Sequence, residues 1–135
     1  MFKGFSSISP FSPRSRDLLS LYFYSSKPCI GVIGAGAAGL TAVKNVVESH
    51  STNYEVRGFE QSEEVGGLWA TGRCWDSLMT NLPANAVMAF RDFPYPNGPS
   101  YVHHTAVRQY LRDYADAFGL RKYFAFGTRV TSVRH

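Results

Sequence analysis

Residues 29–40 read Cys-Ile-Gly-Val-Ile-Gly-Ala-Gly-Ala-Ala-Gly-Leu, and this stretch decides the fold that the sequence predicts. The apolar run Cys29–Ile33 predicts a buried strand, which passes without a spacer into a G-x-G-x-x-G motif. Glycine suits each motif position: Gly34 lets the chain reverse, Gly36 removes a Cβ that would keep a pyrophosphate away, and Gly39 lets a helix pack against the strand. Phosphates would then accept hydrogen bonds from the unpaired N–H groups at the start of that helix.

The residues that follow give this motif the context of a dinucleotide site. Apolar residues recur at helical spacing over 37–48, and Tyr54–Phe59 predicts a second strand, ending at Glu60. Glu60 lies about twenty residues after Gly39, where a carboxylate accepts hydrogen bonds from ribose hydroxyls. Its negative charge opposes a 2′-phosphate, which predicts FAD or NAD, and not NADP, as the first ligand. The alternative is a glycine-rich turn with a structural role only.

The composition is that of a soluble globular protein of one domain, 135 residues long with a net charge of +4. The basic residues are scattered, which argues against a nucleic-acid partner, and an anionic cofactor accounts for the charge. The two cysteines, Cys29 and Cys74, do not make a disulfide framework; we interpret them as small buried side chains in a reducing compartment. No apolar run is long enough to span a bilayer.

The first 27 residues differ in composition from the rest of the chain. They are rich in serine and carry four basic residues, including Arg14 and Arg16, against the single acid Asp17. This composition resembles an organelle transit peptide more than a secretory signal; the alternative is a disordered leader, or an extension without a targeting role. We therefore divide the chain into a leader, 1–27, and a folded part, 28–135.

A glycine pair and a long loop follow Glu60. Gly66 and Gly67, with Trp69 just after them, indicate backbone drawn close to the cofactor with the indole covering it. The alternative is an ordinary turn with a core tryptophan. Residues 70–104 contain many prolines and glycines and predict a loop, whose aromatic side chains favour packing over disorder.

The last third of the chain predicts regular structure again. Thr105 is a plausible N-cap, and an amphipathic helix should run from it until Gly119 stops it. Short strands are expected over 123–126 and 129–133, on either side of Gly127.

Together these segments resemble the N-terminal part of the flavin-containing monooxygenases, FAD and NADPH enzymes that oxygenate nitrogen and sulfur. The resemblance covers about Lys27 to His135. Its most specific part is Thr-Asn-Leu-Pro at 80–83 followed by Asp-Phe-Pro at 92–94, because the glycine motif is shared by many flavoproteins. It also includes residues 32–40, 59–60, 65–69, 95–96, 110–111 and 126–133.

The resemblance assigns a catalytic role to Asn81 and cofactor binding to a larger set. Asn81 resembles an active-site asparagine near the flavin ring and the nicotinamide ribose, and an amide suits this place because it both donates and accepts hydrogen bonds. The alternative for Asn81 is a turn former before Pro83. The implied cofactor-binding residues are Gly34, Ala35, Gly36, Ala37, Ala38 and Gly39 at the FAD pyrophosphate, Glu60 at the ribose, Gly67, Leu68 and Trp69 on the flavin side, and Thr80, Asn81 and Leu82 towards NADP.

The resemblance implies an α/β, Rossmann-like FAD-binding domain with a parallel sheet, incomplete because the second G-x-G-x-x-G, for NADPH, is not in the sequence. The implied function is the FAD-binding portion of an NADPH-dependent monooxygenase, which uses molecular oxygen to oxygenate an amine or a sulfide through a C4a-hydroperoxyflavin. This fragment alone is expected to be inactive. The full-length protein would be cytoplasmic or associated with the endoplasmic reticulum, or mitochondrial if the leader is a transit peptide.

Two alternatives to this function stay open. One is another flavoprotein with two dinucleotides, an amine oxidase or a reductase, although Cys29 and Cys74 do not supply a reductase's redox pair. The other is a truncated product that binds FAD without catalysis.

Three further features are interpreted as structural. His103 and His104 are adjacent and lack other ligands at metal-binding spacing, so we expect loop residues and no metal. Asp92 is expected to cap or bridge backbone in its loop, with a pocket acid as the alternative. Gly58 should weaken the second strand somewhat.

Overall fold

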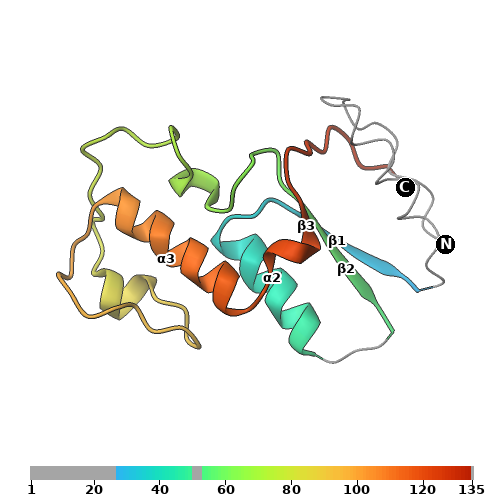
Figure 1. Cartoon of the computed structure of the whole chain (residues 1–135), viewed down its shortest axis with the longest axis horizontal. Helices are drawn as coiled ribbons and strands as arrows, with labels where there is room; N and C mark the ends of the chain where they lie inside the picture. The colour runs from blue at the N-terminus through green and yellow to red at the C-terminus, as the bar shows by residue number, and fades with distance from the viewer. Residues whose placement is uncertain (1–26, 50–52, 135) are drawn as a thin grey trace.

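The computed structural model describes residues 27–49 and 53–134, so the predicted leader lies outside the described residues except for Lys27. Figure 1 shows the arrangement of the elements. In chain order they are strand β1 (Cys29–Ile33), helix α2 (Ala37–Glu48), strand β2 (Glu55–Phe59), the 3-10 turn η1 (Gly67–Trp69), the π-helical turn η2 (Ala84–Met88), helix α3 (His104–Ala117), the 3-10 turn η3 (Arg121–Tyr123) and strand β3 (Phe124–Ala125).

The three strands form a parallel sheet in the order β1-β2-β3, which confirms the predicted α/β class. Cys29 pairs with Glu55 and Ile33 with Phe59, so β1 and β2 end at the same edge. Hydrogen bonds extend this edge beyond the strands, because the Gly34 N–H donates to Phe59 O at 2.8 Å. The carboxyl edge of the sheet therefore carries both the glycine turn and Glu60, as expected for parallel strands.

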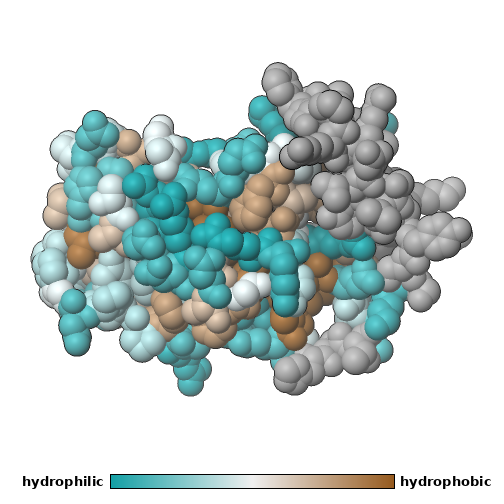
Figure 2. Space-filling model, in the orientation of Figure 1, coloured by the Kyte–Doolittle hydropathy of each residue, from teal (hydrophilic) through white to brown (hydrophobic). Residues whose placement is uncertain are grey.

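The main core lies where α2 and α3 meet the sheet. Leu40 and Val43 of α2 and Tyr114 of α3 are fully buried and share one hydrophobic cluster with Leu111 and Phe124. Both helices show the predicted amphipathic spacing, which places their apolar side chains on one face. On the face drawn in Figure 2, the remaining apolar side chains form separate patches between hydrophilic ones.

The loop over 70–104 is packed only in part: Phe93 and Tyr95 lie against the main core, whereas Trp75 and Tyr101 are 69% and 55% exposed. Residues 78–80 pair with the end of the loop: the Thr80 N–H donates to Val102 O at 2.8 Å, and the His104 N–H donates to Leu78 O at 3.0 Å. The Phe93 ring is tilted against the Tyr110 ring of α3 and the Tyr95 ring is stacked on it, with centroids 5.5 and 4.8 Å away. The middle of the loop is thus held to α3.

The predicted N-cap of α3 is wrong by two residues. The helix begins at His104, and the cap is His103, whose Nδ1 accepts the Thr105 N–H at 3.4 Å. Thr105 is instead the second residue of the helix, and both its N–H and its hydroxyl contact His103 Nδ1. The predicted stop is confirmed, since Gly119 has a φ of +59° directly after the helix.

Two expectations about the strands are also wrong. Cys29 is exposed and Ile33 is 60% exposed, because α2 covers only one face of β1. Residues 129–133 form no continuous strand, although Val130 lies in an isolated bridge. Only Phe124–Ala125 of the 123–126 segment pairs with β2.

Candidate functional site

Glu60 and the glycine turn form one hydrogen-bonded unit. The Ala35 N–H donates to Glu60 Oε2 at 2.7 Å, and the Ser62 N–H donates to Oε1 at 2.8 Å. The side chain is buried, since Glu60 is only 4% exposed. The predicted ribose acid is therefore held in place by backbone N–H groups of the segment after β1 and of the segment after β2.

These donors keep Glu60 ionised. Burial alone would raise the pKa of Glu60, but the N–H groups of Ala35 and Ser62, the Ser62 hydroxyl and the positive charge of Arg73 outweigh it, and the pKa lies below its ordinary value of 4.5. A carboxylate has about four acceptor positions, and these three donors occupy three of them. Glu60 can thus still accept a hydrogen bond from a hydroxyl group such as that of a ribose.

The fold itself requires glycine at two of the three motif positions. Gly34 has a φ of +97°, which side chains rarely tolerate. A Cβ at Gly39 would lie 1.8 Å from Gly34 O, so the helix could not approach the turn. Gly36 differs: its φ is −81°, and a Cβ there would meet Gly67 Cα at 3.5 Å, an ordinary contact. The protein's own packing does not explain Gly36.

The start of α2 suits an anion. Gly36 is the N-cap and provides no side-chain acceptor, and the first turn contains no acidic residue. The N–H groups of this turn, which includes Ala37, Ala38 and Gly39, lie at the positive end of the helix dipole. This is the arrangement that binds phosphate groups in other proteins.

The η1 turn packs directly against the glycine turn. The Gly66 N–H donates to Ala35 O at 3.0 Å, and a Cβ at Gly67 would lie 2.9 Å from Gly36 Cα. Leu68 is 66% exposed beside this contact. Trp69 is half-buried and packs against both hydrophobic clusters, so much of its indole belongs to the core, as the alternative interpretation proposed.

Sequence reasoning missed the charged residues that hold η1. Glu64 accepts the Thr71 N–H at 2.8 Å and forms an ion pair with Arg112 of α3. Arg108, one turn earlier on α3, donates to Thr71 Oγ1 at 3.1 Å. The only sequence signal was an acid just before the glycine pair and two arginines four residues apart on a helix.

Thr80, Asn81 and Leu82 lie on the paired end of the 70–104 loop. Thr80 is 7% exposed, and its Oγ1 accepts the Val102 N–H at 3.0 Å. Asn81 is exposed, as is Leu82 at 48%. The hydrogen bonds of Thr80 thus go to Val102 rather than to the glycine turn, and the roles of these three residues in cofactor binding stay predictions.

Asp92 bridges its loop to α2, which sequence reasoning did not foresee. It forms an ion pair with Lys44, whose Nζ also lies 2.5 Å from Glu48 Oε2. Lys44 is 5% exposed, and the hydrogen bonds to Asp92 and Glu48 raise the pKa of its amine. The buried lysine therefore stays charged and joins the loop to the helix.

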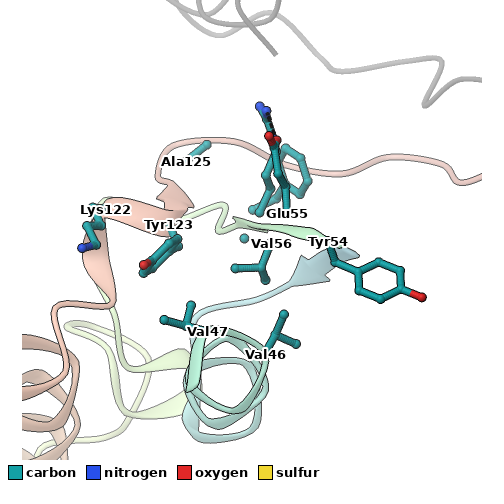
Figure 3. A pocket seen from close by; sticks show the side chains of 11 residues that line it. Val46, Val47, Tyr54, Glu55, Val56, Lys122, Tyr123 and Ala125 are labelled. Carbon is teal, nitrogen blue, oxygen red and sulfur yellow. Dashed lines mark hydrogen bonds and ion pairs between the residues drawn. The ribbon is translucent and has the colours of Figure 1, made fainter. Parts of the chain in front are cut away.

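A separate hollow of about 430 Å³ is lined by the last turns of α2, by β2 and by the η3–β3 segment. Figure 3 shows Val46 and Val47 of α2 on one side of it and Val56 and Tyr123 on another. Lys122 lies at its border. None of the predicted cofactor residues lines this hollow.

The described residues give two further results. Over 27–49 and 53–134, no three His, Cys, Asp or Glu side chains come together in a way that could hold a metal ion. No helix in those ranges is long and apolar enough to cross a membrane.

Comparison with known proteins gives consistent matches to flavin-dependent monooxygenases. A family model described as flavin-binding monooxygenase-like matches this range. Flavin-containing monooxygenase 5 of Rattus norvegicus is 39% identical over 118 residues, which cover 81% of this chain and 21% of that protein. The chain therefore spans about a fifth of the length of this relative.

Solved structures share the fold. An oxidized steroid monooxygenase bound to NADP aligns with a TM-score of 0.64 and 28% identity, covering 73% of this chain and 19% of that one. The S-allyl-L-cysteine S-oxygenase of Allium sativum aligns with a TM-score of 0.63 and 26% identity, covering 75% of this chain and 28% of that one.

Proposed function

This chain belongs to the flavin-binding monooxygenase-like family, and from that premise we propose that residues 28–135 bind the ADP half of FAD at the carboxyl ends of β1 and β2. The observation that carries this proposal is Gly36. The fold accepts a Cβ at this position, whereas Gly34 and Gly39 are needed by the backbone itself. A glycine that the protein does not need is explained by a ligand that approaches its backbone.

The residues around Gly36 match the groups of the ligand in their order along it, from the ribose to the pyrophosphate. The Glu60 carboxylate has acceptor capacity for a ribose hydroxyl. The first turn of α2 presents N–H groups to the pyrophosphate. The ionised state of Glu60 disfavours a 2′-phosphate at the same place, which favours FAD over NADP for this site.

For the whole protein we propose NADPH-dependent oxygenation of a soft nucleophile, an amine or a sulfide, with molecular oxygen. The redox and oxygen chemistry would be supplied by bound FAD reduced by NADPH. In this chain, Asn81 would offer an amide that donates and accepts hydrogen bonds near the reacting groups. Two matched proteins support the proposal: one is named an S-oxygenase, and another was solved bound to NADP.

Other flavoprotein functions have less support. A disulfide reductase requires a pair of redox cysteines in one motif, whereas Cys29 lies at the start of β1 and Cys74 in the loop after η1. A flavin-binding product without catalysis makes a separate prediction: the chain would bind FAD, and the complex would not oxidise NADPH.

FAD binding by the full chain tests the proposal, with titration calorimetry and thermal unfolding measured together. We expect Gly36→Ala to weaken FAD binding at least about tenfold while the melting temperature stays unchanged, because the added methyl group blocks the ligand and not the fold. Gly98→Ala is the matched control, since nothing lies within 4 Å of a Cβ there. The proposal fails if the unaltered chain does not bind FAD, or if Gly36→Ala binds it equally well.

A further inference from the structure

Four side chains close the segment that carries η1; we call Glu64, Thr71, Arg108 and Arg112 the Glu64 clamp. Glu64 and Thr71 lie at the two ends of the segment and are joined by a 2.8 Å hydrogen bond from the Thr71 N–H. Both ends are also tied to α3, Glu64 by its ion pair with Arg112 and Thr71 by its bond from Arg108. The segment is therefore a short loop whose two ends are bonded to each other and to α3.

The clamp and the glycine turn hold η1 from opposite ends. On the glycine side, Gly66 donates to Ala35 O, and the backbones of Gly67 and Gly36 are in contact. On the helix side, the clamp's polar bonds tie the two ends of the segment to α3. Apolar packing of Val65 and Trp69 against the clusters that contain α3 side chains adds to them. The position of η1 relative to Gly36 thus depends in part on Glu64 and Arg112.

The ion pair between Glu64 and Arg112 is partly buried, which reduces its screening by solvent. The Glu64 side chain is 21% exposed and the Arg112 side chain 32% exposed. The bonds from the Thr71 hydroxyl, the Arg112 guanidinium and the Thr71 N–H lower the pKa of Glu64 to about 2. Hydrogen bonds between charged partners of this kind are stronger than neutral ones.

If FAD binds at the site proposed above, the clamp holds the segment that lies beyond the pyrophosphate. Glu60 would hold the ribose and Gly36 the pyrophosphate, so a ligand that continues past Gly36 next meets Gly67 and the exposed Leu68. A ligand that ends at the pyrophosphate does not reach η1.

We propose that Glu64 and Arg112 are positioning residues, which set the affinity for the part of the ligand beyond the pyrophosphate without touching it. Loosening the clamp should let η1 move away from Gly36 and remove part of its contact with the flavin half of FAD. The ribose and pyrophosphate contacts should be unaffected, because Glu60 and α2 are held by their own bonds.

The test compares FAD with ADP as probes on the full chain by titration calorimetry. Glu64→Gln keeps an oxygen that can accept the Thr71 N–H but removes the charge that Arg112 needs. We expect the FAD dissociation constant to rise about tenfold, the scale of one lost charge-assisted bond, and the ADP constant to change less than about twofold. Arg112→Met should give the same result, and Arg112→Lys should restore much of the FAD affinity.

A general loss of stability is distinguished by the same pair of probes. If Glu64→Gln weakens FAD and ADP equally, or changes neither, the positioning role is wrong. Asp116→Asn is the matched control, since it removes an ion pair with Arg121 on an exposed part of α3 and should change neither constant. If the unaltered chain binds neither probe, the proposed FAD site itself is refuted.

If Glu64→Gln unfolds the chain, the FAD and ADP dissociation constants are compared between Arg112→Lys, which keeps the charge, and Arg112→Met, which removes it. Amide exchange adds a readout without ligand: exchange of the Trp69 and Ala70 N–H groups, which bond within η1, should be faster in Arg112→Met. Unchanged exchange there would contradict the clamp.

Discussion

Glu60 accepts the Ala35 N–H at 2.7 Å across 25 residues of sequence, and this bond joins the end of β2 to the glycine turn after β1. The acid expected to bind a ribose thus also fixes the turn expected to bind a pyrophosphate. The two halves of the site are arranged before any ligand enters, which lowers the ordering cost of binding.

The stabilising effect of Glu60 should depend on pH. Its pKa is lowered in the folded chain, so its contribution is present above the unfolded value of 4.5 and is lost as the pH falls through the lower folded value. Glu60→Gln removes the titrating group. We therefore expect the stability difference between Glu60→Gln and the unaltered chain, measured by urea unfolding, to shrink from pH 6 to pH 3. A constant difference would contradict this origin.

Gly39→Ala should destabilise the fold itself. The added Cβ would lie 1.8 Å from Gly34 O, a backbone atom that cannot rotate away. Overpacking of this kind costs about 3 kcal/mol of unfolding free energy. Urea unfolding of Gly39→Ala beside Gly98→Ala measures it, and equal midpoints for the two variants would refute the close packing.

Gly58→Ala should destabilise β2 for a different reason. Its Cβ would lie 2.1 Å from the Cδ1 atom of the buried Phe124 ring on β3. We expect a loss of about 2 kcal/mol, the usual scale for a displaced core side chain. Because a smaller side chain makes room, Phe124→Leu should cost less in the Gly58→Ala background than alone. Additive costs in this double-mutant cycle would argue against the contact.

Tyr110→Phe should loosen the 70–104 loop. The Tyr110 hydroxyl accepts the Phe90 N–H at 2.7 Å and donates to Phe93 O at 2.5 Å. Losing both bonds should cost about 2 kcal/mol in thermal or urea unfolding. Tyr101→Phe, on a side chain that is 55% exposed, is the control and should be neutral. A neutral Tyr110→Phe would show that the hydroxyl does not hold the loop.

The sequence predicted the parts of the fold that local patterns encode. The bounds of β1 and α2 were correct because the apolar run, the glycine motif and the helical spacing adjoin each other. The stop of α3 at Gly119 was correct because only glycine readily adopts its φ of +59°. The glycine pair was expected to bring backbone close to the cofactor; the structure brings Gly67 against Gly36, and the approach to a cofactor stays a prediction.

The features that sequence reasoning missed depend on distant partners. Glu64 and Arg112 are separated by 48 residues, and neither belongs to a motif. Gly58 was expected only to weaken its strand, although its missing side chain makes room for Phe124. Cys29 was expected to be buried because an apolar run does not reveal that only one face of its strand is covered. These contacts and exposures follow from how the helices, strands and loops pack together, and the spacing of residues in the sequence does not specify that packing.

A titration of the isotope-labelled chain with FAD, followed by backbone amide NMR, tests the central claim most directly. The account predicts that the largest shifts occur at Gly36 to Gly39, at Ala35 and at Ser62, where the turn and the acid meet. Shifts that cluster instead around the hollow beside Val47, Val56 and Tyr123, or no shifts at saturating FAD, would contradict a cofactor site at the carboxyl edge of the sheet.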